Sequence, residues 1–384
     1  MKICFVVNSV ETEGAGTTVY IMHEAWKRGH EVYLMGVGDF SFSQNEAISI
    51  ISVSLPKKAE PATPEENLEI LQSDKATRKK FKATELDVLF IRNNPTEEGT
   101  DRNWAENAGV AFGRMIQQEG VLVLNDAFAL SHAFIDKLYF EELPAHIKPD
   151  SLITRDKNEI LEFFENQKKR MILKPLEGSG GRGVYLIDKN EKNLNQIIEN
   201  LSKKGYIIAQ EYLPAAKEGD VRVLMLNGKI LEKNGKYGIL KRKTNEGDFR
   251  SNISQGGTPE AIEITDDIRK IVDTIAPRLI RDGMFFVGLD VVKDKLIEIN
   301  VLSPGGLDGL AKIGVDNFSD VIVEAIEKKV EYKKYYEKTI AELTSVEVKR
   351  LGDNLVISHV VEAGLPDGDT ASYWVDVWNP GGQI

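Results

Sequence analysis

The segment GLDVVKDKLIEINVLSPGG, residues 288–306, constrains the fold more than any other part of the sequence. Its apolar residues predict two buried strands, and KDK at residues 293–295 supplies the turn between them. In such a hairpin Asp290 lies opposite Glu298, and Asn300 projects from the same face two residues further on. Buried carboxylates need partners or a metal, and a few hard oxygen ligands with open positions suit Mg²⁺. The alternative is a hairpin whose polar residues face water.

A glycine-rich segment, ILKPLEGSGGRGV at residues 172–184, precedes this hairpin. An apolar strand ends at Lys174, and the loop that follows contains Gly178, Ser179, Gly180 and Gly181. Glycines let backbone N–H groups approach a phosphate closely, and the lysine can meet the same phosphate as a point charge. Because the lysine precedes the glycines and no GK[ST] follows, this is neither a Walker A loop nor a Rossmann fingerprint. A plain glycine-rich turn is the alternative.

Two further segments are candidates for ligand contacts. IIAQEYLP, residues 207–214, is an apolar strand whose backbone could read the edge of a nucleotide base, although an ordinary buried strand fits as well. KRKTNEGDFRSNISQGG, residues 241–257, collects basic side chains in an irregular polar segment. In an acidic protein such a cluster is a candidate clamp for phosphate or carboxylate, and a solvated charged loop is the alternative.

The remaining sequence predicts three regions. In residues 1–126 short apolar strands alternate with helices, which is typical of a parallel α/β sheet. Residues 127–330 have an α+β pattern with antiparallel hairpins, and residues 331–384 form a C-terminal extension with a polar helix and turn-rich strands. Residues 55–84 are rich in Pro, Lys and Glu and are interpreted as a surface excursion or mobile loop.

Composition excludes several classes of protein. The formal net charge of −11 argues against a general nucleic-acid binder. Cys4 is the only cysteine, so a disulfide framework and a cysteine metal cluster are excluded, and its apolar surroundings predict a buried thiol. The N-terminus is a poor signal peptide, and no apolar run approaches the roughly 20 residues that span a bilayer. We expect a cytoplasmic protein without membrane partners.

Taken in order, these segments resemble the ATP-grasp ligases, and their wording is most similar to that of bacterial glutathione synthetases. The motifs that carry the resemblance are IRNNP with Arg92, LKPLEGSGG, GDVRVL with Asp220 and Arg222, the pair Arg242 and Arg250 spaced by eight, and FVGLD followed by LIEINVLSP. The resemblance covers about residues 1–330. The extension from residue 331 has no counterpart.

The resemblance implies an N-terminal substrate-binding α/β domain, then an ATP-grasp fold of two α+β subdomains. It implies that the residues that bind ATP are Lys137, Lys174, Gly178, Ser179, Gly180, Gly181, Gln210, Glu211, Tyr212, Leu213 and Asp220. The implied catalytic residues are Arg222, Arg242 and Arg250, and the implied substrate contacts are Arg92, Asn252, Ser303, Gly305 and Gly306. Asp290, Glu298 and Asn300 would hold two Mg²⁺ ions, with Mn²⁺ as a substitute.

The implied reaction activates a carboxylate as an acyl phosphate, which an amine then attacks. γ-Glutamylcysteine and glycine are the expected small-molecule substrates, and a homo-oligomer, dimer or tetramer, is the expected assembly. The alternatives are a ligase that joins a different amino acid to a peptide-like acid, and an inactive nucleotide-binding regulatory module. An acyl phosphate must be shielded from water, so we expect residues 241–257 and the glycine loop to be mobile lids in the absence of ligand.

Overall fold

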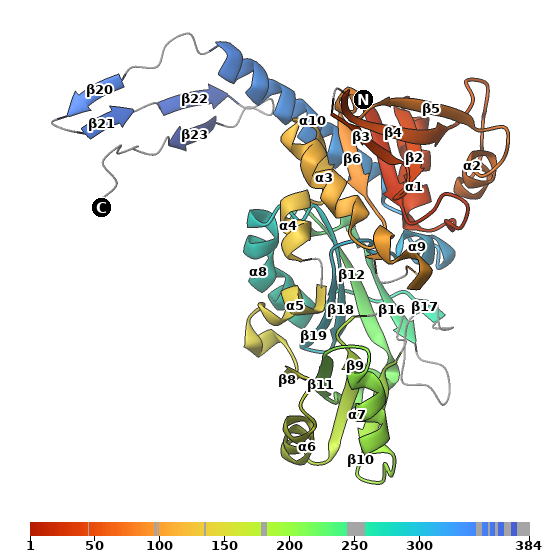
Figure 1. Ribbon diagram of the computed structural model, residues 1–384, viewed down its shortest axis with the longest axis vertical. Coiled ribbons are helices and arrows are strands. Elements are labelled where there is room, and N and C mark those ends of the chain that lie inside the picture. The colour runs from red at the N-terminus through yellow and green to blue at the C-terminus, as the bar shows by residue number, and fades with distance from the viewer. Residues whose placement is uncertain are drawn as a thin grey trace. The chain divides into compact units, whose positions relative to one another are not determined.

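The computed structural model divides into two compact units, Met1–Ile322 and Val323–Ile384. It describes residues 1–44, 46–95, 98, 100–133, 136–177, 183–243 and 258–342, together with residues 348–351, 354–357, 360–364 and 370–374. The described part of the first unit contains three large sheets and a two-stranded sheet, β14-β15 (Figure 1).

The first sheet has seven strands and is built around parallel pairs, as the sequence predicted. The parallel strands are β1 (Lys2–Val7), β2 (Glu31–Gly36), β6 (Val88–Ile91) and β7 (Leu122–Leu124), and the crossover helices include α1 (Thr17–Lys27) and α3 (Ala108–Gln118). Five of the six residues of β1 are buried, including Cys4, because layers cover both faces of this strand.

The edge of this sheet corrects part of the interpretation of residues 55–84 as a surface excursion or mobile loop. The edge elements are β3 (Phe40–Ser43), β4 (Glu46–Ser54), α2 (Pro64–Leu71) and β5 (Thr77–Lys82). The hydroxyl of Thr63 caps α2 by accepting a hydrogen bond from the backbone N–H of Glu66, and β5 pairs antiparallel with β4 along its length. The loop interpretation was wrong, whereas the surface position was right, since five of the six residues of β5 are exposed and give it the composition of a surface loop.

The second sheet has four strands in the order β10-β9-β11-β8, with antiparallel pairs. Its elements are β8 (Ser151–Thr154), α6 (Lys157–Asn166), β9 (Arg170–Pro175), β10 (Tyr185–Asp188), α7 (Leu194–Ser202) and β11 (Ile207–Glu211). The apolar face of α7 packs into a small core with buried Ile198 and Leu201.

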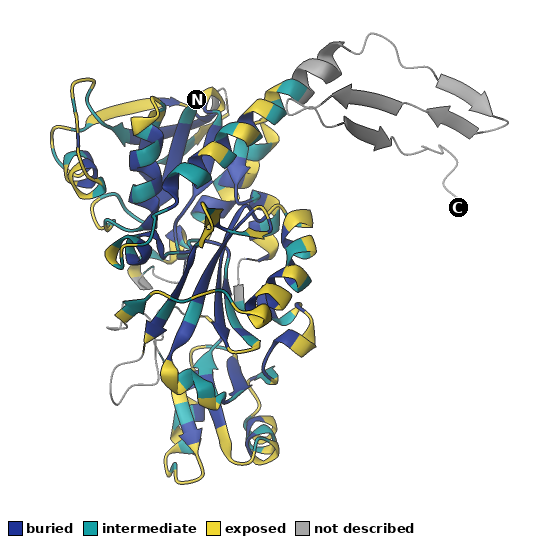
Figure 2. Ribbon diagram, turned by 180° about the vertical axis from the view of Figure 1, so that it is seen from behind, coloured by how far each residue is buried: buried dark blue, intermediate teal, exposed yellow. Residues whose placement is uncertain are grey.

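The third sheet carries the predicted hairpin of Asp290, Glu298 and Asn300. Its strands are β12 (Asp220–Leu226), β13 (Lys229–Ile230), β16 (Ile239–Lys243), β17 (Thr258–Glu260), β18 (Phe286–Val292) and β19 (Lys295–Asn300). All seven residues of β18 are buried (Figure 2). A tight turn at Asn227–Gly228 joins β12 to β13, and the turn predicted at residues 293–295 lies at Lys293–Asp294, with Lys295 already in β19. Helix α8 (Asp266–Arg281) begins after Thr265, whose hydroxyl accepts from the N–H of Ile268 as expected.

One hydrophobic core joins the first and third sheets, since residues such as Val6 and Leu289 belong to the same buried cluster. Asn125, just after β7, adds a polar connection. Its side-chain amide donates to the carbonyls of Phe286 and Val301, at 3.0 and 2.6 Å, and its side-chain oxygen accepts from the N–H of Phe286 at 2.8 Å. The N-terminal sheet is therefore held to β18 and to the residue after β19.

The other elements of the first unit are short. They are η1 (Ala83–Glu85), η3 (Thr100–Ala105), α4 (Ala127–His132), α5 (Asp136–Glu141), η4 (Ala145–Ile147), η5 (Pro214–Glu218), β14 (Glu232–Lys233), β15 (Lys236–Tyr237) and α9 (Leu307–Lys312).

Helix α10 (Ser319–Glu342) runs without interruption through the predicted start of the C-terminal extension at residue 331. Two antiparallel hairpins follow it. They consist of β20 (Val348–Leu351) with β21 (Asn354–Ile357), and β22 (Val360–Gly364) with β23 (Thr370–Trp374). Among the described residues, no helix is both long and apolar enough to cross a membrane.

Gly219 precedes β12, and a substitution at this position tests the packing between β12 and β16. Its φ is +97°, and a Cβ atom there would lie 2.0 Å from the carbonyl oxygen of Arg242. We predict that Gly219→Ala lowers the free energy of unfolding by about 2 kcal/mol more than Gly29→Ala. Gly29 also has a positive φ, +84°, but has no atom within 4 Å of its Cβ position. Equal urea-unfolding midpoints for the two variants would contradict this.

Candidate functional site

Three neighbouring strands of the third sheet align polar residues in one row. Arg222 on β12 lies opposite Asp290 on β18, and Asp290 lies opposite Glu298 on β19. Asn300 pairs with Gly288 in the next row, two residues along on the same face. The predicted pairing of Asp290 with Glu298 is confirmed, although the register of the hairpin shifts between Asp290 and Val291. The opposite face of the same strands supplies apolar residues to the core.

Asp290 is the centre of a buried ion network. Its carboxylate accepts from Arg222 Nε at 2.5 Å and Nη2 at 3.1 Å, and from Arg242 Nη2 at 2.9 Å. Arg242 also holds Asp220, through Nε at 2.6 Å and Nη2 at 2.8 Å. All four side chains are at least 90% buried, so each charge depends on these partners rather than on water.

Burial and charge act in opposite directions on these groups. Burial by itself raises the pKa of Asp290, but Arg222 and Arg242 outweigh it and hold the pKa down to about 2. Burial opposes the charge on Arg242 as well, yet Asp290 and Asp220 keep its pKa above the ordinary value. Asp290 and Arg242 are therefore both charged throughout the neutral range.

The oxygen atoms on this face fit a hard divalent cation. Asp290 accepts three N–H bonds, which leaves about one of the roughly four lone-pair sites of a carboxylate. Glu298 and Asn300 are partly exposed beside it, and the amide nitrogen of Asn300 has no hydrogen-bond partner among the described residues. Among the described residues, no group of three His, Cys, Asp or Glu side chains could hold a metal ion. A metal here would therefore use two carboxylates, the Asn300 amide oxygen and ligands from a substrate.

The loop after β19 is attached to this network. The Gly305 carbonyl accepts from Arg222 Nη1 at 2.8 Å. The hydroxyl of Thr17, at the start of α1, accepts from the N–H groups of Gly306 and Leu307, at 2.9 and 3.1 Å. Gly288 makes the approach possible, because a Cβ atom there would lie 3.0 Å from Pro304 and 3.4 Å from Arg222. Residues 304–306 thus lie between the third sheet and the N-terminal helix.

Arg92 contacts the same loop from the N-terminal sheet. Its Nη2 donates to the Pro304 carbonyl at 2.7 Å, and its Nε donates to the Thr18 hydroxyl at 3.2 Å. The guanidinium is buried, which lowers its pKa to about 10 although the charge of Glu13 opposes this. Its Nη1 has no hydrogen-bond partner in the part of the chain that the structure describes. A buried guanidinium nitrogen in this state favours a carboxylate or phosphate ligand.

The predicted nucleotide contacts lie in the second sheet. Lys174 Nζ on β9 donates to the side-chain oxygen of Gln210 on β11 at 3.1 Å. The side-chain nitrogen of Gln210 and the hydroxyl of Tyr212 are buried without a hydrogen-bond partner among the described residues. Arg170 lies over the Tyr212 ring, 4.2 Å from its centroid. These polar atoms offer both hydrogen-bonding groups and an aromatic ring to a base.

Lys137 connects the second sheet to the third. Its Nζ donates to the carbonyl of Pro175 at 3.0 Å, next to Lys174. Lys137 lies on α5, and α5 packs against β19, the strand that carries Glu298 and Asn300. Contacts therefore run from the end of β9 through α5 to the row of oxygen ligands.

The structure brings some predicted residues together and leaves others undescribed. Joined in one network are Arg92, Asp220, Arg222, Arg242, Asp290, Gly305 and Gly306. Glu211 instead accepts from the backbone N–H of Asp150, while Leu213 and Ser303 follow β11 and β19. Gly178, Ser179, Gly180, Gly181, Arg250 and Asn252 lie outside the described residues, as does most of the predicted lid at 241–257.

Sequence reasoning missed Thr17, Thr18 and Asn125, all of which fix the parts of the site. One signal for the threonines was present. They open a helix directly after the loop that follows β1, and ligand sites in α/β sheets lie at the carboxyl ends of parallel strands. Nothing in the sequence around Asn125 pointed to its partners, which are more than 160 residues away.

The architecture is that of the ATP-grasp ligases. The ATP-grasp ligase PsnB in complex with its minimal precursor matches 85% of this chain and 99% of its own, with a TM-score of 0.51 at 20% identity. D-cycloserine synthetase DcsG matches 84% of this chain and 99% of its own, with a TM-score of 0.55 at 10% identity. At these identities the likeness shows the fold alone.

Sequence comparison gives the family. The models of the prokaryotic glutathione synthetase N-terminal domain and ATP-grasp domain match residues 1–130 and 136–314. Glutathione synthetase from Gloeobacter violaceus is 32% identical over 317 residues, 80% of this chain and 90% of the relative. The enzyme of that name from Synechococcus elongatus is 29% identical over 334 residues, 85% of this chain and 98% of the relative. The chain belongs to the prokaryotic glutathione synthetase family and is an ATP-dependent ligase.

The ion network predicts a pH dependence of stability. The lowered pKa of Asp290 stabilises the fold above the ordinary carboxylate pKa of about 4, and this contribution is lost as the pH falls toward about 2. We predict that Asp290→Asn costs about 3 to 5 kcal/mol at neutral pH. The difference from the unmodified protein should shrink below pH 4 in urea unfolding.

Glu165→Gln is the matched control. It removes an exposed ion pair with Lys169, 3.3 Å long, and should cost less than about 1 kcal/mol at any pH. A cost for Asp290→Asn as small as this, or one that does not change with pH, would show that the network does not stabilise the fold.

Proposed function

We propose that the chain is a glutathione synthetase, which joins γ-glutamylcysteine to glycine at the expense of ATP. The observation that carries the proposal is the pair of contacts made by Arg222. Its guanidinium binds Asp290 on one side and the carbonyl of Gly305 on the other. It links a cation-binding row to a loop that Arg92 reaches from the N-terminal domain. Membership of the family supplies the substrates.

ATP would lie between the second and third sheets. In this arrangement Lys174 and Lys137 neutralise its phosphates, and the glycine loop at residues 178–181 covers them. The side-chain nitrogen of Gln210, which has no hydrogen-bond partner among the residues that the structure describes, and the backbone of residues 211–213 hold the adenine. Asp220 keeps Arg242 in place beside the nucleotide.

Asp290, Glu298 and Asn300 would hold Mg²⁺, with two ions as the expected number and Mn²⁺ as a substitute. A PsnB structure with a similar fold, 18% identical and with a TM-score of 0.52, contains Mg and ADP. When bound, the metal supplies positive charge next to the phosphates. The task of the chain is to keep the three oxygen ligands on one rigid face of the sheet.

The reaction needs positioning and charge neutralisation rather than a covalent enzyme nucleophile. A carboxylate oxygen of the dipeptide attacks the γ-phosphorus of ATP, ADP leaves, and an acyl phosphate forms. The glycine amine then attacks the acyl carbon, loses a proton, and phosphate leaves. The Nη1 of Arg92, which has no hydrogen-bond partner among the described residues, suits a carboxylate of the acid. Arg222, Arg242 and Arg250 would balance the charge that develops on the phosphoryl group.

In the proposed division of labour residues 1–126 bind the acid, residues 127–330 bind ATP, and Asn252 and Ser303 line the substrate end. Two other functions would use the same fold. One is a ligase that joins a different amino acid to a peptide-like acid, and the other is an inactive nucleotide-binding regulatory module. The intact set Lys174, Asp290, Glu298 and Asn300 argues against the inactive module. We expect a homo-oligomer.

The proposal predicts ADP release that requires both γ-glutamylcysteine and glycine. Lys174→Ala and Glu298→Ala should each lower the turnover at least about a hundredfold, because charge on the phosphates is no longer balanced. The control variants Lys169→Ala and Glu165→Ala change an exposed ion pair and should retain full activity. A coupled assay for ADP measures all four.

Three outcomes separate the alternatives. The protein can be assayed with a panel of amino acids as amines. ADP release with another amino acid, and none with glycine, would show that the chain is a ligase for a different amino acid. Nucleotide binding without turnover for any pair would favour the regulatory module. Unchanged turnover in Lys174→Ala and Glu298→Ala would contradict the assignment of these two residues to the ATP and metal site.

A further inference from the structure

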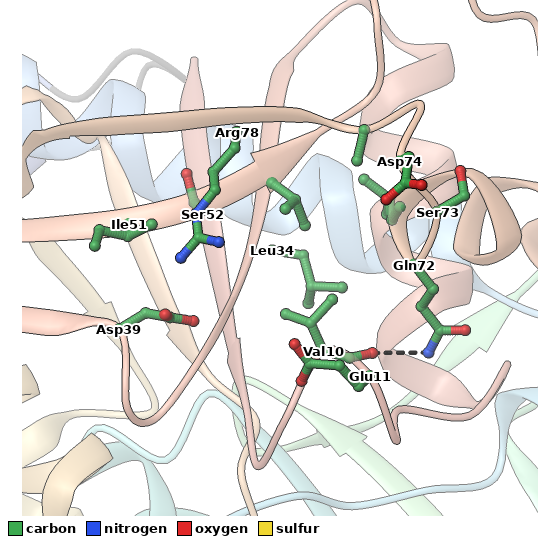
Figure 3. A pocket seen from close by; sticks show the side chains of 13 residues that line it. Val10, Glu11, Leu34, Asp39, Ile51, Ser52, Gln72, Ser73, Asp74 and Arg78 are labelled. Carbon is green, nitrogen blue, oxygen red and sulfur yellow. Dashed lines mark hydrogen bonds between the residues drawn. The ribbon is translucent and has the colours of Figure 1, made fainter.

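A pocket of about 390 Å³ opens in the N-terminal domain, away from the residues of the ion network (Figure 3). It lies between the ends of β2, β4 and β5, the segment that follows β1 and the segment that follows α2. Its lining residues are Val10, Glu11, Leu34, Asp39, Ile51, Ser52, Val53, Leu71, Gln72, Ser73, Asp74, Ala76 and Arg78. The volume falls in the range of small-molecule sites.

One wall of the pocket is a face of the sheet. Leu34 on β2 pairs with Val53 on β4, and Val53 pairs with Arg78 on β5. Residues paired across neighbouring strands project to the same side, so two aliphatic side chains and one guanidinium share this wall. Val10 and Leu71 add further apolar surface.

The pocket contains charges of both signs. The hydrogen bond from Ser9 lowers the pKa of Glu11 most, and the charge of Arg78 lowers it further, so these two pocket charges attract each other. Arg78 forms no ion pair within 4 Å in the part of the chain that the structure describes, and neither does Asp74. Asp39 uses one oxygen to accept from the N–H of Gly36 at 2.9 Å, and Glu11 accepts from the hydroxyl of Ser9. Figure 3 shows Arg78 and Asp39 on one side of the pocket and Asp74 and Gln72 on the other.

From these observations we propose that the pocket binds a small zwitterion, an α-amino acid or short peptide with an aliphatic side chain. The ligand carboxylate binds Arg78, its ammonium group binds the carboxylates, chiefly Asp74, and its aliphatic part lies on the partly exposed Ile51 and Val53. A ligand with both charges satisfies both groups at once, whereas a simple anion or cation leaves one of them unpaired.

One wall of the pocket includes Val10 and Glu11, which belong to the segment between β1 and α1. Gln72 donates from its side-chain nitrogen to the carbonyls of Val10, at 2.7 Å, and Glu13, at 2.9 Å. That segment continues into Thr17 and Thr18, which bind residues 306–307 and Arg92. A ligand beside Gln72 therefore touches a structure that also fixes the proposed acid site, which suits a regulatory ligand.

Ligand binding to the full-length protein, without ATP or substrates, tests this independently of turnover. The probes are L-leucine, L-leucine amide, which lacks the carboxylate, and N-acetyl-L-leucine, which lacks the ammonium group. Saturation-transfer NMR should show saturable binding of L-leucine, and each analogue should bind about tenfold more weakly or worse. Arg78→Ala should weaken L-leucine binding by a similar factor.

Lys80→Ala is the matched control, since Lys80 is an exposed cation on the same strand that does not line the pocket. It should leave binding unchanged. No saturable binding of L-leucine up to about 10 mM would overturn the proposal. Equal binding of either analogue, or equal loss in Arg78→Ala and Lys80→Ala, would also overturn it, because one charge alone or the general surface charge would then account for the affinity.

Discussion

Asp290 must stay charged in a place that water does not reach, and it can do so only because two guanidinium groups approach it from neighbouring strands. Arg222 comes from the strand on one side of β18, and Arg242 comes from the strand beyond that one. An uncompensated charge at this position would cost several kcal/mol, so the register of β12, β16 and β18 and the ionisation of Asp290 depend on each other. The polar face is thereby specified as strictly as the apolar face behind it.

The same network ties together parts of the chain that are distant in sequence. Arg222 reaches residue 305, Arg92 reaches residue 304, and Thr17 reaches residues 306 and 307. The short loop after β19 is therefore in contact with the central sheet, the N-terminal sheet and the first helix. A ligase that protects a reactive intermediate needs such a junction, because a substrate bound there can be enclosed by elements from two domains.

Local pattern was sufficient where the chain folds back on itself over a few residues. The even spacing of Asp290, Glu298 and Asn300 is enough to predict that Asp290 lies opposite Glu298, but not the register shift between Asp290 and Val291 that accompanies the shorter turn at Lys293–Asp294. Local pattern failed for residues 55–84, because an edge strand with one buried side chain, Phe81, has the composition of a loop. The partners of Asp290 could not be predicted either, since Arg222 lies 68 residues away and only the paired strands bring it close.

The charged edge strand has a consequence for how copies of the chain can associate. β5 pairs with β4 alone among the described strands, and it carries Arg78, Lys79, Lys80 and Lys82 on an open edge. A second β5 brought alongside would place like charges opposite each other, and desolvating them would cost more than the new backbone hydrogen bonds return. The sheet is in this way protected against growth from chain to chain, and assembly is directed to other surfaces.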